Sequence, residues 1–403
     1  MQSNARRRMI RIVDHLRIQR ILLLALGLWP YNQSKFVQFQ LLLFFIVSNS
    51  FIIFQLTSFL TSECTVDFIV KLLSIVSFFL ACTAHYIAFW INMYTVKHLM
   101  DRLQHACNEL KDENEIAIMK KYANSAERIA IVITSLTVCA LLSVTLMPLL
   151  PRILSTFLLV NISGPLYTKQ FVTEYFVDKE KNFYLILLHT CASFYIGVIA
   201  FSGGGLVGCA FLKHICGLFS IASYRIEQVM KLNIHEKTDV RRKEMEIEKK
   251  IICAVDIHRT AIELSELFIS SFEGPYFCGL VVVITSLCLN LYEVFQTALI
   301  RDKIEEFILH FGCAGSLLIY SFLGNSCGEE ITEHYNDMFS YAYTIRWYTA
   351  PIHIQKMILF LLQRSCKPYG LKLGGIFIAS LEGFASLSTT SVSYFTVIYS
   401  TQK

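Results

Sequence analysis

Charge is what this sequence lacks most. Only 17% of its 403 residues are Asp, Glu, Lys or Arg, compared with about 25% in a typical globular protein. Charge is missing from whole stretches that each reach the roughly 20 residues a helix needs to cross a bilayer, whereas buried strands of soluble proteins are typically ~4 to 8 residues long. The composition therefore excludes a soluble enzyme and a disordered protein. The uncharged stretches are 36–62, 72–96, 129–151, 182–212, 274–292, 307–328 and 383–402.

Disulfide and metal patterns are also missing. The 13 cysteines contain no C-x-x-C pair, and the 11 histidines contain no H-x-x-x-H or H-E-x-x-H arrangement. Most of the cysteines fall within the uncharged stretches, which indicates ordinary buried side chains rather than the framework of a secreted domain. Gly203-Gly204-Gly205 follows no strand and lacks the lysine pattern of a phosphate loop, so it predicts a bend or close packing in the fourth span. No catalytic residue, metal, cofactor or nucleic acid is expected.

The basic residues predict the orientation in the membrane. Lys and Arg near span ends mark the cytoplasmic side, and 28 of the 36 basic residues fall in the N-terminal segment and in the connections after spans two, four and six. The sequence therefore predicts an all-α polytopic membrane protein with seven transmembrane helices, a cytoplasmic N-terminus and an extracellular C-terminus. A glycosylation sequon at Asn161 lies on the predicted outer side.

This orientation separates the chain from other membrane proteins. It is inverted relative to G-protein-coupled receptors, which have seven helices and an extracellular N-terminus. A transporter would show internal repeats, and the sequence has none. Near the start, Ile21 to Trp29 is too short to span and is followed by no cleavage pattern, so it predicts an amphipathic helix at the inner interface, with Trp29 at headgroup depth.

The seventh uncharged stretch is unusually rich in hydroxyl groups. A helix places one stripe of these residues on a single face, interrupted by a valine. In a ring of several subunits the stripe would line a wet pore and the valine would form an apolar gate. The alternative is that the hydroxyls bond to neighbouring helices within one chain. The residues of the stripe are Ser386, Thr390, Ser393, Val397 and Ser400, and Thr401 follows Ser400.

Aromatic residues gather in the outer halves of the spans. They suit an apolar ligand site, although aromatic residues at helical spacing more often serve packing alone. The candidate ligand-binding residues are Phe78, Phe79, His85, Tyr86, Phe194, Tyr195, Leu289 and Tyr292.

Two polar segments are predicted to be helical on the cytoplasmic side. Mixed charges in 239–250 indicate that spans four and five extend into the cytoplasm. Residues 331–371 are too polar to span, yet Trp347, Ile354, Ile358 and Leu361 follow an apolar period. This period predicts a helix with one buried face, and therefore a candidate element for subunit contact.

The last third of the chain resembles the conserved tail of the insect odorant receptor family, and Leu26 to Pro30 resembles that family's N-terminal segment. The chain departs from the pattern at Arg346, where an acidic residue commonly precedes the tryptophan. The matching positions are Ala342, Tyr343, Trp347, Tyr348, Pro351, Lys356, Arg364, Ser365, Lys367, Pro368, Leu371, Phe377, Leu381 to Phe384 and Ser393 to Phe395.

The resemblance implies a subunit of a ligand-gated, non-selective cation channel in the plasma membrane of an olfactory neuron dendrite. Family members form heterotetramers with a coreceptor, contact one another through a cytoplasmic anchor, and line the pore with the seventh helix, which places Val397 at the gate. The implied anchor positions here are Tyr343, Trp347, Pro351, Lys356 and Arg364.

The chain is expected to be a tuning subunit that binds a small volatile odorant, because the coreceptor resembles a longer chain with a different tail. A gustatory-type receptor channel is the closest alternative. The expected organisation is a cytoplasmic or interfacial segment (1–35), six spans with the odorant pocket in their outer half (36–330), a cytoplasmic anchor helix (331–372) and a pore-lining helix (373–403).

Overall fold

The computed structural model describes residues 12–158, 172–230, 240–298, 300, 303–344, 347–349, 351–365 and 369–401. Asn161 lies outside these residues. Nearly all of the described chain is helical, as predicted. The helices are α2 (Ile12–His15), α3 (Arg17–Ala25), α4 (Lys35–Leu56), η1 (Thr57–Leu60), α5 (Val66–Ile91), α6 (Met93–Asn108), α7 (Glu113–Leu158), α8 (Phe183–Met230), α9 (Val240–Ala298), α10 (Ile304–Thr344), η3 (Trp347–Thr349), α11 (Ile352–Ser365) and α12 (Leu381–Thr401).

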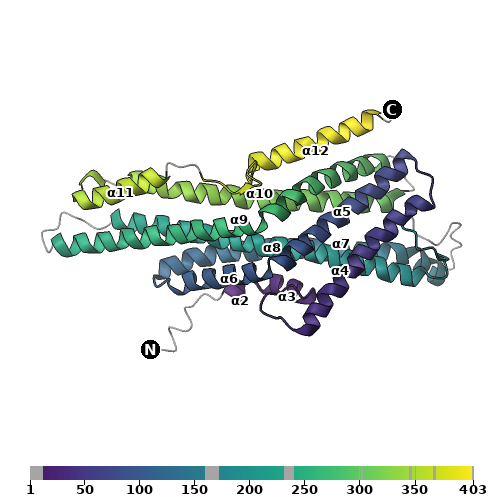
Figure 1. The fold of residues 1–403 in the computed structure, drawn as a ribbon, viewed down its shortest axis with the longest axis horizontal. Helices are drawn as coiled ribbons and strands as arrows, with labels where there is room; N and C mark the ends of the chain where they lie inside the picture. Colours follow the sequence, from purple (N-terminus) through teal and green to yellow (C-terminus); the bar gives the residue numbers. More distant parts are fainter. Residues whose placement is uncertain are drawn as a thin grey trace.

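The helices form an elongated bundle (Figure 1). Helices α7, α8, α9 and α10 run along its length, and α11 lies at the same end as the C-terminal end of α8 and the N-terminal end of α9. We call this the anchor end. The end of α4, the start of α5 and the C-terminal end of α12 lie at the opposite end, which we call the far end. Successive connections therefore alternate between the two ends, as a polytopic protein requires.

Six helices are long and apolar enough to cross a membrane in the part of the chain that is described: α4, α5, α7, α8, α9 and α10. Four of them continue well beyond bilayer thickness, because 41 to 59 residues at about 1.5 Å each exceed 60 Å. Helix α12 is not in this set, since nine of its 21 residues are Ser or Thr. Its length of about 31 Å still matches the hydrocarbon thickness.

The N-terminal segment is buried more deeply than the sequence suggested. Leu23, Leu28 and Trp29 are all at most 4% exposed and belong to the larger hydrophobic cluster. An amphipathic helix is present as α3 over Arg17–Ala25, earlier than the predicted Ile21 to Trp29, and Trp29 follows it buried within the protein. Its ring packs beside Tyr31, with ring centroids 5.8 Å apart.

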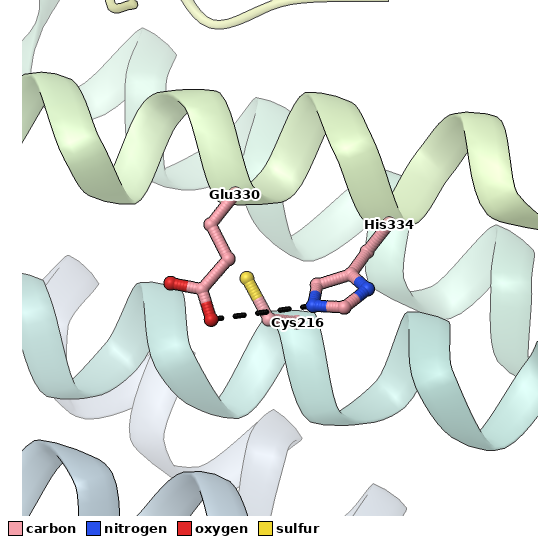
Figure 2. Close-up of side chains that lie close together, drawn as sticks. All are labelled: Cys216, Glu330 and His334. Carbon is pink, nitrogen blue, oxygen red and sulfur yellow. Dashed lines mark ion pairs between the residues drawn. The ribbon is translucent and has the colours of Figure 1, made fainter. Parts of the chain in front are cut away.

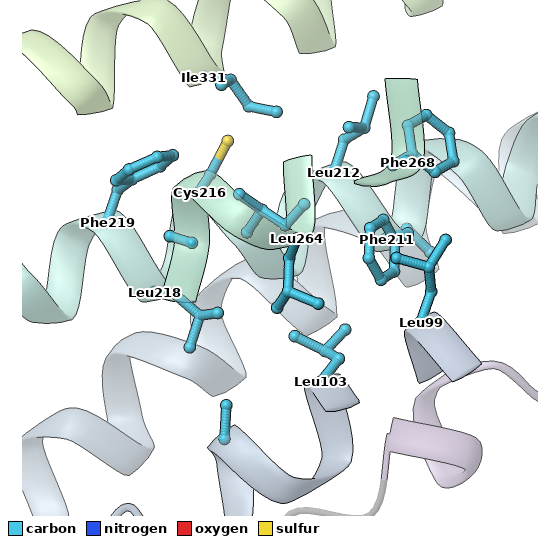
Figure 3. Packing of buried hydrophobic residues seen from close by; sticks show 14 of the residues in the cluster. Leu99, Leu103, Phe211, Leu212, Cys216, Leu218, Phe219, Leu264, Phe268 and Ile331 are labelled. Atoms are coloured by element: carbon cyan, nitrogen blue, oxygen red, sulfur yellow. The ribbon is translucent and has the colours of Figure 1, made fainter. Parts of the chain in front are cut away.

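Two hydrophobic clusters divide the interior. The larger one fills the anchor half, where α6, α8, α9 and α10 interleave aliphatic and aromatic side chains. Figure 3 shows this packing around Cys216, with Leu264 and Phe268 facing Phe211 and Leu212 of α8. The smaller cluster lies toward the far end and includes Phe78 and Phe194.

The three consecutive glycines of α8 permit close packing without breaking the helix. Successive helical residues are rotated by about 100°, so Gly203, Gly204 and Gly205 face three different neighbours. A Cβ atom would lie 3.3 Å from Leu22 at Gly203 and 2.9 Å from His85 Nε2 at Gly204, and it would overlap the Tyr320 ring at Gly205. Of the two predicted alternatives, a bend or close packing, close packing is the one these contacts support.

The anchor end is built from the end of α10, η3 and α11. Ile354, Ile358 and Leu361 are buried in the larger cluster and Trp347 packs against it. One face of α11 is therefore buried, whereas the single helix predicted over 331–371 is divided among α10, η3 and α11. Helix α10 continues without interruption through residue 331, so span six and the start of the anchor are one helix. A short antiparallel hairpin, β1 (Lys372–Leu373) with β2 (Phe377–Ile378), then leads into α12.

Candidate ligand cavity and channel elements

A cavity of about 490 Å³, partly open to the surface, lies between α5, α7, α8, α9 and α10. This volume is within the ~300 to 1,000 Å³ typical of small-molecule sites. No Asp, Glu, Lys or Arg occurs among the described residues that line it. The cavity therefore suits an uncharged, largely apolar ligand. Its aromatic lining residues include Phe78, Phe194, Phe201, Phe268, Tyr276 and Tyr320.

His85 and Tyr320 form the polar centre of the cavity wall. The Tyr320 hydroxyl lies 3.1 Å from His85 Nε2, and the two rings meet edge to face with centroids 5.3 Å apart. Tyr276 packs beside His85 with centroids 5.9 Å apart. These groups can donate or accept a hydrogen bond, whereas the wall hydroxyls of Thr137 and Ser202 already donate to carbonyls of their own helices.

The structure places three of the eight predicted ligand-binding residues on the cavity wall: Phe78, His85 and Phe194. The other five do not line this cavity. Tyr86 donates a hydrogen bond to the Leu41 carbonyl and Tyr195 bonds to Thr145, while Phe79 is buried in the smaller cluster. Tyr292 is fully buried beside Asp67 and Gln296, and Leu289 is half-buried.

Sequence reasoning did not select Phe201, Tyr276 or Tyr320, which the structure adds to the wall. The rings of Phe201 and Tyr320 are in contact, tilted by 34°, with centroids 4.1 Å apart. A signal for Tyr320 existed in Gly205, because a glycine inside a helix indicates close approach of a neighbour. Which neighbour approaches could not be read from one chain.

The hairpin after the anchor closes the cavity at the anchor side. Leu371, Leu373, Phe377 and Ala379 line the cavity, and Gly328 lets α10 approach the backbone of Ala379 closely. Burial raises the pKa of Tyr369 to about 12, so this residue stays neutral. It stacks on Tyr335 of α10 with centroids 4.6 Å apart and bonds to Ser265.

Helix α12 begins on side chains of α10. Asn325 Oδ1 accepts a hydrogen bond from Ser380 N, and Glu329 Oε2 accepts one from Leu381 N, each at 3.1 Å. The Ser380 hydroxyl also accepts from Gly383 N at 3.0 Å, as an N-cap does. Because Asn325 lines the cavity, the ligand wall and the start of α12 share a contact.

The two faces of α12 differ. One face packs against α9 and α10, with Leu387 and Ser391 buried and Phe384 against Phe322. The predicted hydroxyl stripe lies away from the bundle: Ser386, Ser393, Val397, Ser400 and Thr401 are exposed, and Thr390 is half-buried. Figure 1 shows α12, in yellow, along the edge of the molecule.

The stripe hydroxyls present acceptor atoms outward. Ser393, Ser400 and Thr401 each donate a hydrogen bond to a carbonyl of their own helix, as Thr390 does to Ser386 O. A hydroxyl that has used its proton keeps oxygen lone pairs for water or a cation. Val397 is 56% exposed on the same face, and the stripe therefore offers oxygen ligands interrupted by one apolar residue.

A polar cluster joins α8 to α10 on the anchor side of the cavity. Cys216, Glu330 and His334 bring one ligand atom each within 4.8 Å of one another (Figure 2). Each polar partner is already engaged, since Glu330 pairs with Lys213 and His334 bonds to the Tyr122 hydroxyl at 2.8 Å. We interpret the cluster as a network that links α7, α8 and α10.

The predicted anchor residues lie at the anchor end. Tyr343 is 66% exposed, Lys356 is exposed, and Pro351 and Trp347 are half-buried. Arg364 is in the last turn of α11. Around them α11 leaves a group of large apolar side chains exposed, including Ile352 and Phe360 at 72% each.

A sequence match that covers most of this fold decides the family. Residues 65–392 match the model of the 7tm odorant receptor family. The chain belongs to the insect odorant receptor family. It is therefore a multi-pass membrane receptor and not an enzyme, as the sequence predicted.

Solved receptor structures share the fold of this odorant receptor. The olfactory receptor OR5 from Machilis hrabei in complex with eugenol is 18% identical, covers 97% of each chain and superposes with a TM-score of 0.75. The same receptor without the ligand is 19% identical over 95% of this chain and 96% of that one, with a TM-score of 0.74. At this identity the likeness establishes the arrangement of helices and leaves the ligand of this odorant receptor open.

Proposed function

We propose that this odorant receptor is the ligand-sensing subunit of a ligand-gated, non-selective cation channel that opens together with coreceptor subunits. The proposal rests most directly on α12, whose oxygen-bearing face is turned away from its own bundle. A wet face exposed to lipid would be unfavourable. If α12 and its counterparts in other subunits surrounded a pore, water in the pore would hydrate this face.

The ligand of the proposed channel is a small, uncharged volatile held in the cavity. A molecule of about ten heavy atoms buries on the order of 250 Å² of apolar surface, which contributes roughly 6 kcal/mol before association costs. Affinity is then modest. The solved relative was captured with eugenol, a comparably small molecule, and His85, Tyr276 and Tyr320 supply the polar contacts that set preference here.

The coupling between ligand and pore runs through α10 and the hairpin. The cavity wall includes Asn325, which caps the start of α12, and Ala379, which precedes it. A ligand shifts the channel toward the open state only if it binds that state more tightly. We propose that α10 moves with the cavity and carries α12 outward, which widens the ring of Val397 side chains.

The anchor end supplies the proposed subunit contacts. Exposed apolar side chains on α11 and the end of α10 resemble an interface more than a free surface. Coreceptor subunits at this contact would complete a heterotetramer in the plasma membrane of an olfactory neuron dendrite, with the N-terminus in the cytoplasm.

The gate residue provides the test. Val397→Ala should raise the basal current of the receptor coexpressed with a coreceptor by several fold, because a smaller side chain weakens an apolar constriction. Val392→Ala is the matched control, since it makes the same change in α12 at a side chain 48% exposed off the stripe. Whole-cell recording measures both. If basal current, ion selectivity and block were all unchanged in Val397→Ala, the valine would not line the pore.

A further inference from the structure

Helices α8 and α10 face each other with matching rows of reactive side chains. Cys209, Lys213 and Cys216 lie on one face of α8, and Cys327, Glu330 and His334 lie on one face of α10, at the three- and four-residue steps that share a helical face. The rows meet in layers. Cys209 meets Cys327, Lys213 pairs with Glu330, and Cys216 lies beside Glu330 and His334 (Figure 2).

The first layer is a thiol pair close to bonding distance. The sulfur atoms of Cys209 and Cys327 are 3.4 Å apart, and a disulfide bond is about 2.05 Å long. Closure therefore needs a movement of about 1.4 Å. The Lys213–Glu330 ion pair lies one turn further along both helices and holds the two thiols in register. Both cysteines are free in this structure.

Access to the pair comes from the cavity. Cys209 is 8% exposed and Cys327 is 3% exposed, yet both line the cavity wall. A small neutral molecule that enters the cavity can reach them. Peroxide is such a molecule.

The pair is on the side of the membrane where thiols are kept reduced. Cys209 and Cys327 stand at the anchor-side ends of the uncharged stretches 182–212 and 307–328, which the basic residues assign to the cytoplasm. Disulfides on that side are rare and, where present, usually transient and sensing. The resting state is then the dithiol, and cytosolic reductants can restore it.

We propose that Cys209 and Cys327 form a peroxide-sensitive thiol pair that closes to a disulfide and fixes α8 to α10 at the inner end of the ligand cavity. One thiolate attacks a peroxide oxygen, the O–O bond breaks, and a sulfenic acid and hydroxide form. The second thiol attacks the sulfenic sulfur and releases water. Overall, two thiols lose two electrons and two protons, and hydrogen peroxide becomes two molecules of water.

The first experiment detects the bond itself and is independent of channel activity. Full-length receptor in membranes is treated with hydrogen peroxide, remaining thiols are alkylated under denaturing conditions, and the digest is analysed by mass spectrometry. We expect a linked peptide that contains Cys209 and Cys327, absent from untreated membranes and lost on reduction with dithiothreitol. Cys209→Ser or Cys327→Ser should abolish it. Cys288→Ser, which removes a buried thiol on α9 outside the cavity lining, should retain it.

Two results would overturn the pairing. One is that both thiols are recovered alkylated at a peroxide dose that oxidises the exposed Cys64. The other is that the peroxide-induced bond joins Cys327 to Cys216 instead.

The second experiment measures the consequence and rests on the proposed channel function. Peroxide should lower the odorant-evoked current of the receptor coexpressed with a coreceptor at least twofold, and dithiothreitol should restore it. Each variant is compared with its own untreated current, and the double change Cys209→Ser with Cys327→Ser should remove the peroxide effect. A linked peptide with an unchanged current would refute the fixing of α8 to α10. Absence of any evoked current before treatment would instead count against the proposed function, and the peptide would still decide the chemistry.

Discussion

In the anchor half of the bundle, ion pairs between charged side chains link the helices. Around the cavity, no charged side chain occurs among the described residues that line the wall. Arg225 of α8 binds Glu115 of α7 through two hydrogen bonds of 2.6 and 3.0 Å, and Arg102 binds Glu263 at 2.8 Å. Around the cavity, aromatic rings and one histidine meet instead. The difference indicates a rigid anchor half and a more adaptable region around the cavity.

The largest expected effect comes from breaking a link in the anchor half. Arg225→Ala leaves Glu115, which is 6% exposed, without its cation, and it also removes a bond to the Cys253 carbonyl. Removing one partner of a fully buried ion pair lowers the free energy of unfolding by about 3 to 5 kcal/mol. Because this pair is partly exposed, we expect a smaller loss, of at least ~2 kcal/mol. We expect the apparent melting temperature of the detergent-solubilised receptor to fall by several degrees.

The control for this change is Arg259→Ala. Arg259 pairs with Glu263 on the surface of α9, and its side chain is 75% exposed, so its loss should alter stability by less than about 1 kcal/mol. Fluorescence-detected size-exclusion chromatography after heating measures both variants. Equal melting temperatures for the two would contradict the assignment of rigidity to the Arg225 link.

A smaller effect is expected from adding one carbon to the cavity wall. Gly205→Ala places a methyl group against the Tyr320 ring, and overpacking of this kind costs about 1 to 3 kcal/mol. The concentration of odorant for half-maximal current should therefore rise about fivefold or more. Gly315→Ala is matched to it, because Gly315 also lines the cavity but a Cβ atom there meets nothing within 4 Å. Similar shifts in both variants, at equal surface labelling, would show that Gly205 has no special contact.

The smallest expected effect concerns the polar centre. Tyr320→Phe removes the hydroxyl that lies 3.1 Å from His85, and one hydrogen bond is worth about 0.5 to 1.5 kcal/mol. Responses to oxygen-bearing volatiles should weaken about three- to tenfold, while those to hydrocarbons of the same shape should change less. Tyr195→Phe, which removes a hydroxyl off the cavity wall, should leave this ratio unaltered. Dose-response recordings on both ligand classes decide the matter.

Long-range pairing explains what the sequence could and could not predict. The spans, the polar last helix and the buried face of α11 follow local periodicity, and each was predictable. The cavity depends on which helices meet, and helical spacing on α5 could not show that His85 would face Tyr320 and Gly204 while Tyr86 turns to Leu41. The cysteines were predicted to be ordinary buried side chains, and the approach of Cys209 to Cys327 requires two helices 118 residues apart in sequence.

The hydroxyl stripe shows a different limit. Its position on one helical face was predictable from steps of three and four residues, but the sequence left open whether the face packs within the chain. The fold turns Leu387 and Ser391 inward and so leaves the stripe outside. Packing within the chain, which depends on residues distant in sequence, therefore decides which face of α12 is exposed.

The glycine triplet of α8 restricts how such a receptor can change over evolutionary time. Gly203, Gly204 and Gly205 touch α3, α5 and α10 within a single turn, so a larger residue at any of them displaces a different helix. Phe78 and Phe194 of the cavity wall belong to the smaller cluster. A larger side chain at one of these positions can therefore be compensated by a smaller one at the other. In the proposed odorant site, new preferences are then expected to arise by paired substitutions among these aromatic residues, while the three glycines stay unchanged.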